Sequence, residues 1–469
     1  MLRYSVILLF IILIPLSCER EPSSVNLKLR FSADTIYFDT VFTTIGSTTR
    51  ELRVRNPENT RIYIDHIYLS GGEESPFRLN IDGEPAFEKR DIDLGAGDSI
   101  FIFVDVIIDP TSADSPVAVT DSIIFVTGDN IQKVQLLAWG QDIILIKEKL
   151  IQSETWSGLK PYVIYDNVMV DTSETLVIEE GTRVLFHRNG SLTLAGNLVV
   201  NGSDGSPVIF AGDRPEKMYE DIPGQWKGIC FLSISKGNYL NHAIIRNAIN
   251  GIRMGEGGDV NEIPDLKLFS SNISHSAVSG LTAINGYIEA ANCIFSHSGS
   301  YCVYIAAGGD YTFTHCTIYN RWDYGFRLSA SLYVYEKPAV NGGRTSQLNF
   351  NLNNSVVYGD IISEVEIVPL VKGYTGNYYF DHCLLKLDTI NSAFWDSDEF
   401  PGALINMNPV FIDVGTLDLR PDTLSPLIDN GNPAFLSIYP FDIRGVSRSQ
   451  DGKPDIGAYE RVPGEHKQD

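Results

Sequence analysis

The 469-residue sequence predicts an all-β chain, with an N-terminal antiparallel β-sandwich followed by a solenoid of β-strands. Residues 27–145 contain short strands with period-two alternation, separated by Gly, Asn and Asp turns. In residues 146–403, small and apolar residues recur in columns at coil-like spacings. Long stretches rich in Ala, Glu, Lys and Leu are missing, which excludes a helical bundle or coiled coil.

Composition limits the class of function. Hydrophobic residues make up 43% of the chain and charged residues 20%, which is typical of a globular protein. Lys plus Arg is 36 against 59 Asp plus Glu, so the net charge is −23. Such an acidic surface repels phosphate backbones, so we expect no nucleic-acid partner. We expect a monomer.

The N-terminus reads as an export signal. Arg3 precedes nine consecutive apolar residues, Val6 to Ile14. A membrane span needs about 20 residues, whereas a signal peptide needs a shorter apolar run. We therefore expect residues 1–17 to be removed and Cys18 to be lipidated. The alternative is an ordinary cleaved signal with an incidental Cys.

The segment around Cys18 resembles a bacterial lipoprotein lipobox, Pro15-Leu16-Ser17-Cys18. Residues 18–26 form a polar tether, and its Glu19 and Glu21 resemble the acidic export signal of Bacteroidetes-type lipoproteins. The resemblance implies an outer-membrane lipoprotein of the cell envelope, displayed at the cell surface and held by an N-terminal lipid.

Residues 27–145 contain seven or so short strands, which suggests an antiparallel sandwich. Two segments resemble immunoglobulin-like modules of the ASPM/hydin type: FDTVFTTIGSTTRELRVRNPENTRIYIDHIYLSGG and DSIFIFVDVIIDP. This resemblance implies the fold and a scaffold role only.

The solenoid prediction for residues 146–403 rests on columns that stay in phase. One column of small residues has gaps of 28, 22, 23, 39 and 28: Ala243, Ser271, Cys293, Cys316, Ser355 and Cys383. Positions two after and three before it are apolar throughout. A further column is Gly280, Cys302 and Gly325, followed by Leu281, Val303 and Phe326. Residues 171–230 resemble the first coils of right-handed parallel β-helices of the pectate-lyase-like superfamily.

The columns also explain the five cysteines that follow Cys18. They alternate with Ala, Ser and Gly, so we expect free thiols that act as small buried apolar groups. Stacked strands lie about 4.8 Å apart, which leaves a Cys293–Cys316 disulfide as the alternative.

Residues 404–462 contain NPVF, SPLIDNGNP and DGKPDIGAYE, and residues 463–469 form a polar tail. The first stretch resembles the choice-of-anchor Q region of bacterial surface β-helix proteins, and we expect it to cap the last coil. Calcium is the one cofactor kept open, at Asp451 and Asp455, where capping of a turn is the preferred interpretation.

No catalytic or metal site follows from the histidines. His242, His315 and His382 precede the small column, at the predicted corner of coils that are too far apart to share a zinc ion. His275 and His297 are one coil apart and are expected to form a polar ladder. The aligned outward columns contain no pair of carboxylates such as a glycoside hydrolase needs.

Two polar and aromatic stretches are the best candidates for a binding site, because aromatic rings beside hydrogen-bonding groups suit sugars. The predicted glycan-binding residues are Tyr219, Gln225, Trp226, His315, Arg321, Trp322 and Tyr324. Trp226 and Trp322 are expected about four coils, or roughly 20 Å, apart. The alternative is that both tryptophans pack loops onto the solenoid.

Two hypotheses of function remain. The first is a membrane-anchored, non-catalytic scaffold that binds glycans or acts in adhesion. The second is a polysaccharide lyase or glycoside hydrolase, since parallel β-helices often carry such enzymes, although fold alone supplies no activity. A groove of aromatic residues favours the first, and clustered carboxylates or an Arg or Lys base favour the second.

Overall fold

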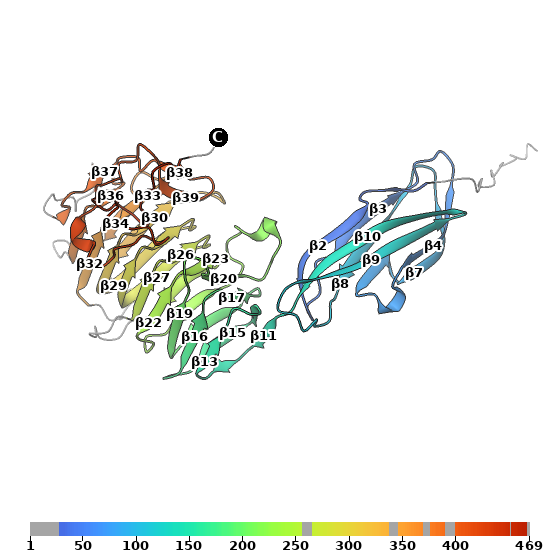
Figure 1. Cartoon of the computed structure of the whole chain (residues 1–469), viewed down its shortest axis with the longest axis horizontal. Coiled ribbons are helices and arrows are strands. Elements are labelled where there is room, and N and C mark those ends of the chain that lie inside the picture. Colours follow the sequence, from blue (N-terminus) through green and yellow to red (C-terminus); the bar gives the residue numbers. More distant parts are fainter. Residues whose placement is uncertain are drawn as a thin grey trace, which may run out of the picture. The chain divides into compact units, whose positions relative to one another are not determined.

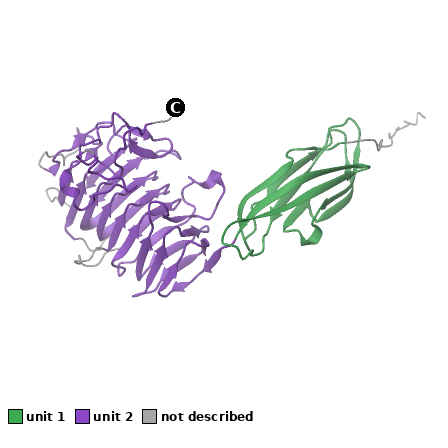
Figure 2. Cartoon of the chain, viewed as in Figure 1, with its two compact units in different colours: residues 1–141 green, residues 142–469 purple. Residues whose placement is uncertain are grey.

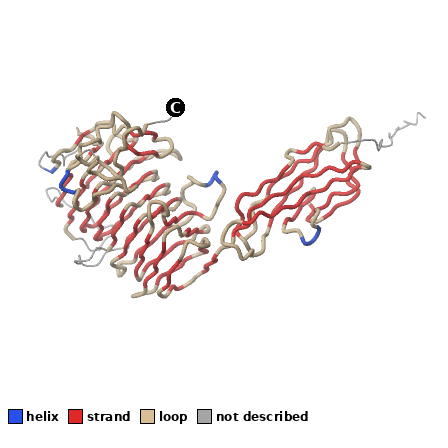
Figure 3. Tube along the Cα trace, viewed as in Figure 1, coloured by secondary structure: helices blue, strands red, loops and turns tan. Residues whose placement is uncertain are grey.

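The computed structural model describes residues 28–255, 265–336, 346–368, 376–389, 399–450 and 452–466. The predicted signal peptide and Cys18 lie outside these residues. No helix in the described part is long and apolar enough to cross a bilayer. The chain divides into two compact units between residues 141 and 142 (Figure 2), where the sequence suggested a boundary after 145. Strands dominate both units (Figure 3).

The first unit is a sandwich of two five-stranded sheets (Figure 1). The first sheet has the order β1 (Arg30–Phe31), β3 (Arg50–Arg55), β8 (Ser99–Val106), β5 (Phe77–Ile81) and β6 (Glu84–Pro85). The second has the order β2 (Thr35–Phe42), β10 (Asn130–Gln141), β9 (Val117–Thr127), β4 (Ile62–Leu69) and β7 (Glu88–Leu94). A short 3-10 helix, η1 (Gly72–Glu74), follows β4.

Period-two alternation builds the core of this sandwich. Leu52 and Val54 of β3 are fully buried, as are Ile62 and Ile64 of β4. Every strand pair is antiparallel except β2 with β10, which is parallel. The antiparallel sandwich expected from the sequence is therefore confirmed, with one parallel pair added.

The second unit is a parallel β-helix whose strands form three faces. Face 1 contains β12 (Leu150–Ile151), β15 (Asn167–Val170), β18 (Ser191–Leu194), β21 (Gly228–Phe231), β24 (Asn250–Met254), the first halves of β27 (Ser279–Ala291) and β29 (Tyr301–Thr314), β31 (Leu332–Tyr335) and β34 (Val365–Val368). Face 2 contains β13 (Glu154–Trp156), β16 (Thr175–Glu179), β19 (Asn197–Asn201), β22 (Asn238–Asn241), β25 (Leu266–Phe269), the second halves of β27 and β29, β32 (Leu348–Asn353) and β35 (Asn377–Asp381).

Face 3 completes each coil. It contains β11 (Ile144–Lys147), β14 (Tyr162–Tyr165), β17 (Arg183–Phe186), β20 (Val208–Gly212), β23 (Ala243–Arg246), β26 (Asn272–Ser274), β28 (Ile294–Ser296), β30 (Thr317–Asn320), β33 (Val356–Gly359), β36 (Leu384–Leu385) and β37 (Leu404–Ile405). Neighbouring strands of all three faces are parallel, so each coil buries its interior side chains only against the coils above and below.

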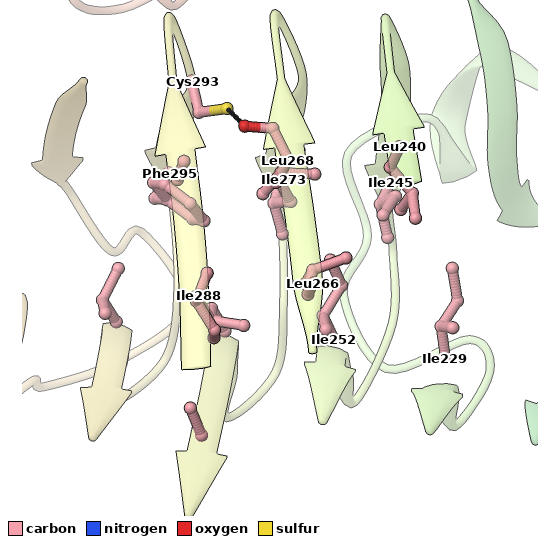
Figure 4. Close-up of a cluster of buried hydrophobic side chains, with 14 of the residues drawn as sticks. Ile229, Leu240, Ile245, Ile252, Leu266, Leu268, Ile273, Ile288, Cys293 and Phe295 are labelled. Carbon is pink, nitrogen blue, oxygen red and sulfur yellow. Dashed lines mark hydrogen bonds between the residues drawn. The ribbon is translucent and has the colours of Figure 1, made fainter. Parts of the chain in front are cut away.

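Strand registers confirm the main columns predicted from spacing. On face 3, Ile245 pairs with Ile273, which pairs with Phe295, and the column continues to Leu385. Leu240, Leu268 and their successors align in the same way on face 2. Figure 4 shows these side chains stacked in the interior.

The third predicted column is wrong at its last member. Val303 pairs with Leu332 of β31, not with Phe326, and Phe326 is fully exposed. Residues 321–331 form a loop inserted before β31, so the coil is longer there than a constant spacing assumes.

Left-handed backbone turns the chain at two kinds of corner in many of the coils. Between faces 2 and 3 the corner residues have φ of 45° to 54°: His242, Ser270, Asn292, His315, Asn354 and His382. Between faces 3 and 1, Asn247, His275 and His297 have φ of 65°, 51° and 47°. This region is sparsely populated by residues other than Gly, with Asn and His enriched in it. The polar corner column expected from the histidine spacing is confirmed.

The described cysteines are free thiols, and four of them are buried: Cys293, Cys302, Cys316 and Cys383. The Sγ of Cys293 donates a hydrogen bond of 3.2 Å to the carbonyl oxygen of Leu268 (Figure 4). Burial raises the pKa of Cys302 and of Cys383, which keeps these thiols protonated. Cys230 differs from the expectation, because it points outward from face 1 and is half-buried.

The C-terminal residues do more than cap the last coil. β37 adds the final rung to face 3, and β38 (Phe411–Asp413) pairs with β39 (Asp418–Pro421). The chain, including η4 (Pro433–Phe435), then runs back along the outside of face 3, where Ile456 and Ala458 pack on Val356 and its neighbours. The expectation of an end cap is therefore too narrow, since this segment covers a side of the β-helix.

A buried ion pair fixes this segment. Nη1 of Arg448 lies 3.3 Å from Oε2 of Glu460, and both side chains are fully buried. Nη2 of Arg448 also donates to Oδ1 of the corner residue Asn292, at 2.9 Å. Asp455 accepts backbone hydrogen bonds from Asp429 and Arg461, which is the capping role preferred over calcium binding. Asp451 lies outside the described residues.

The two kinds of cysteine position predict opposite responses to a charge. Cys293→Asp places a carboxylate in the apolar interior, and we expect a loss of several kcal/mol in unfolding free energy. Cys230→Asp is the matched control and should change stability by about 0.5 kcal/mol or less. Chemical denaturation measures both. Equal stability of the two variants would contradict the assigned columns.

Candidate functional site

Two loops carry five of the seven predicted binding residues. The first, residues 213–225, connects face 3 to face 1 and contains η2 (Lys217–Tyr219). The second, residues 321–331, is the insertion before β31. Both leave the β-helix at the corner between faces 3 and 1.

The first loop is held closed by Gln225 and Tyr219. Nε2 of Gln225 donates to the carbonyl oxygens of Tyr219 and Ile222, at 2.7 and 2.8 Å. The guanidinium of Arg214 lies 3.9 Å from the centre of the Tyr219 ring, in a cation–π contact. Gln225 and Tyr219 therefore hold the loop in its conformation, and other residues of the loop are the ones exposed to solvent.

The two loops meet each other, although the sequence interpretation treated them as two separate stretches. Oη of Tyr324 donates a hydrogen bond of 3.2 Å to the carbonyl oxygen of Asp221. The rings of Trp322 and Tyr324 lie 5.3 Å apart, and Arg321 pairs with Asp323 at 3.1 Å. The first loop extends across several coils. A count of the coils between Trp226 and Trp322 gives no information about how far such a loop reaches.

Two predicted site residues are wrong because they are buried. Trp226 is fully buried, stacks on Phe186 with ring centres 3.9 Å apart, and donates from Nε1 to the carbonyl oxygen of Arg246. His315 is fully buried at the corner between faces 2 and 3, where its Nε2 contacts the Asn354 amide at 3.2 Å. Burial and the nearby Arg448 hold the pKa of His315 well below its usual range. Neither side chain can contact a ligand in this fold.

Beneath the loops lies the predicted histidine ladder. The rings of His275 and His297 are 5.1 Å apart, and Nε2 of His275 is 3.6 Å from Oδ1 of Asp221. Burial lowers the pKa of His275, and burial together with His275 lowers the pKa of His297 to about 4. Among the described residues no group of three or more His, Cys, Asp and Glu side chains is arranged to hold a metal ion.

Face 1 carries a group of aromatic residues that the sequence interpretation missed. Tyr301, Tyr304 and Tyr333 point outward and are half-buried, with ring centres 5.0 to 5.9 Å apart. The rings of Tyr304 and Tyr333 are nearly parallel, at 13°. We call these three residues the tyrosine platform. Trp322 lies over Gly299, two residues before Tyr301, so the second loop borders the platform.

The platform belongs to a row of outward side chains along face 1. Paired positions on successive strands are Thr193, Cys230, Arg253, Thr282, Tyr304, Tyr333 and Glu366. Six strand spacings of about 4.8 Å give the row a length of about 29 Å. A hollow of about 270 Å³ opens at its N-terminal end, lined by Thr193, Lys227, Cys230, Asn250 and Arg253 among others.

The chemistry of this row is mostly neutral. Burial raises the pKa of Tyr304, and burial with Glu366 raises the pKa of Tyr333 to about 12, so both phenols stay protonated at neutral pH. Oγ of Ser279 bonds Oδ1 of Asn250 at 2.9 Å beside the row. The arrangement offers apolar ring faces next to hydroxyl and amide groups.

A second hollow, of about 550 Å³, lies where the C-terminal segment meets the corner of faces 2 and 3. His242, Ser270 and Asn292 form one wall, and Tyr439 and Phe441 form the other. It has no row of aromatic side chains across successive coils, so face 1 is the better candidate for an extended ligand.

The sequence contained a signal for the platform. Leu281 and Val303 are interior residues of face 1, so the next residues, Thr282 and Tyr304, must point outward. Tyr333 was missed because Phe326 had been placed in the column that Leu332 occupies.

Comparison with protein families matches residues 227–381 to the right-handed β-helix region family, which agrees with the predicted handedness. No curated protein matches the chain. This is a β-helix protein whose family match covers about a third of the sequence.

Two solved structures show remote likeness. One is a family 123 glycoside hydrolase from Clostridium perfringens, described for glycolipid glycan hydrolysis: identity is 8% and the TM-score 0.19, over 28% of this chain and 30% of that chain. The other is the catalytic unit of a thermostable GH87 α-1,3-glucanase from Streptomyces thermodiastaticus strain HF3-3: identity is 10% and the TM-score 0.22, over 66% and 67%. Neither likeness identifies a ligand for this chain.

The histidine ladder predicts a defined pH dependence of stability. The folded pKa of His297 is about 4, against about 6.5 in an unfolded chain, so the unfolded state binds more protons between these values. Stability from this group is complete above pH 6.5 and falls by about 3 kcal/mol as the pH drops to 4.

His297→Asn removes this titration and keeps a residue that the same corner uses at Asn247. Urea denaturation at several pH values should show that the variant loses less stability than wild type below pH 6.5. Identical pH profiles would contradict the burial assigned to His297.

Proposed function

We propose that the chain is a surface-anchored, non-catalytic β-helix protein that binds a neutral oligosaccharide along face 1. The observation that carries this proposal is the tyrosine platform: three outward aromatic rings gathered on adjacent parallel strands, bordered by Trp322 and Tyr324. Aromatic faces bind the apolar faces of sugar rings, and the rigid strands hold them at fixed spacing.

The surroundings of the platform favour a neutral, extended ligand. Phenol, hydroxyl and amide groups donate and accept hydrogen bonds with sugar hydroxyls without a charge. The row is about 29 Å long, which suits several sugar units better than a single one. Because the contacts are short-range and uncharged, binding should respond little to salt.

Removing platform rings tests the proposal. Tyr304→Ala and Tyr333→Ala should each weaken binding of a glycan-array hit by roughly 10-fold, since a stacked ring contributes about 1 kcal/mol or more. Tyr379→Ala, which removes an exposed tyrosine from face 2, is the matched control and should bind like wild type. Undiminished binding by folded Tyr304→Ala and Tyr333→Ala proteins would refute the site.

A second candidate function is glycan cleavage, and one observation favours it. Asp221 and Asp323 stand on the two touching loops, and both oppose the burial that lowers the pKa of His275. Two carboxylates that flank the bond to be cut are what a glycosidase needs. Incubation of the array hit with the protein distinguishes binding from cleavage. Shorter products that are formed by wild type and not by Asp221→Asn would show that the protein is an enzyme.

Anchoring at the outer membrane is the second half of the proposal. It rests on the apolar run before Cys18 and on the polar tether after it. We expect the acylated chain to fractionate with membranes and Cys18→Ser to become soluble, because an acyl-bearing cysteine is needed for stable anchoring. Membrane association that survives Cys18→Ser would contradict lipidation.

A further inference from the structure

The outward face of the first sandwich sheet carries three arginines close together. Arg30 on β1 is directly opposite Arg55 on β3, and Arg53 lies two residues away on the same face. Like charges directly opposite each other destabilise a sheet. This concentration of positive charge is the more unusual because the chain has a net charge of −23. We call Arg30, Arg53 and Arg55 the arginine face.

These arginines are not neutralised. Within the described residues none of the three forms an ion pair with a carboxylate, and Nε of Arg53 donates only to Oγ of Ser99. All three are exposed and line a hollow of about 200 Å³ with Phe31 and Ser32.

Several basic residues at the other sheet of the sandwich are paired. There Arg61, Lys89 and Arg90 each pair with a carboxylate, on Asp93, Glu84 and Glu88. The arginine face leaves three guanidinium forks available for an anion.

Exposed aromatic residues adjoin the arginines. Phe101 and Phe103 of β8 point to the same side and are each 39% exposed. The Arg53 guanidinium lies 5.8 Å from the centre of the Phe101 ring. Guanidinium groups beside exposed apolar rings suit a surface that offers phosphates and an apolar boundary together.

The position of the arginines in the chain indicates which surface that is. Arg30 follows Cys18 by 12 residues, which span at most about 40 Å when fully extended. We propose that the arginine face docks on the phosphates of anionic lipid headgroups, in the membrane to which Cys18 is held. The choice of the membrane that holds Cys18 depends on the anchoring proposed above, whereas the affinity for phosphate-bearing lipid does not depend on it.

The test uses the chain from residue 18 onward with Cys18→Ser, so that both units are present and no acyl chain contributes. Vesicles of phosphatidylcholine alone, and of phosphatidylcholine with phosphatidylglycerol, are sedimented with the protein. We expect binding only to the anionic vesicles, and weaker binding as salt is added.

Two triple variants separate the arginine face from net charge. Arg30→Gln with Arg53→Gln and Arg55→Gln should weaken vesicle binding by roughly 100-fold, about fivefold for each arginine. This variant should be as stable as wild type or more stable, because like charges are removed. Arg61→Gln with Lys89→Gln and Arg90→Gln changes the charge equally and should bind within about twofold of wild type.

Several outcomes would overturn the proposal. One is equal binding to anionic and neutral vesicles, and another is an equal loss of vesicle binding in the two triple variants. A third is displacement of the protein from anionic vesicles by inorganic phosphate or a sulfated glycan as effectively as by added vesicles. The tests of the two proposals are independent. Tyr304→Ala changes the other unit and should leave vesicle binding unchanged.

Discussion

Left-handed backbone at the corners of the coils from His242 to His382 is the constraint on which this part of the β-helix depends. A corner residue with φ near +50° turns the chain in a single step, so the strand after it starts at the same register in each coil that has such a residue. His, Asn and Ser at these corners tolerate that backbone better than β-branched residues do. Since each corner repeats, interior columns such as Ile273 and Phe295 stack on each other, and so do the outward rows. The tyrosine platform is a consequence of this repetition, because Tyr304 and Tyr333 occupy one outward position on adjacent strands.

The interior could be predicted from the sequence, and the surface largely could not. A buried column tolerates only small or apolar residues, so the residue types in the column of Cys293 and Cys316 indicate that these positions face the interior. Outward positions carry no such restriction. The alternation shows that Tyr304 points outward, but it does not show that the next strand brings Tyr333 beside it. Trp226 misled because an aromatic residue among polar neighbours looks exposed, whereas the ring of Phe186 one coil earlier provides a surface for it to stack on.

Loops were the second source of error, for a geometric reason. The solenoid has a fixed rise per coil, so distances along it can be counted, but a loop is free to cross several coils. Residues 213–225 do so and bring Asp221 to Tyr324. The C-terminal segment does the same on face 3, where Arg448 reaches Asn292 from far along the chain. Its fully buried pair with Glu460 would leave an uncompensated charge if either partner were lost.

The two units present surfaces of opposite character, each on a rigid sheet. Face 1 of the β-helix offers uncharged rings and hydroxyls, and the first sheet of the sandwich offers unpaired guanidinium groups. Under the proposed function, the sandwich contacts the membrane and the β-helix contacts the glycan, so the two interactions use separate domains.

The most direct test of this account is a crystal structure of the protein with a neutral oligosaccharide selected by the array. The account predicts sugar rings over Tyr304 and Tyr333, running along face 1 toward Arg253. Sugar bound instead in the hollow between His242 and Tyr439, with face 1 empty, would contradict it.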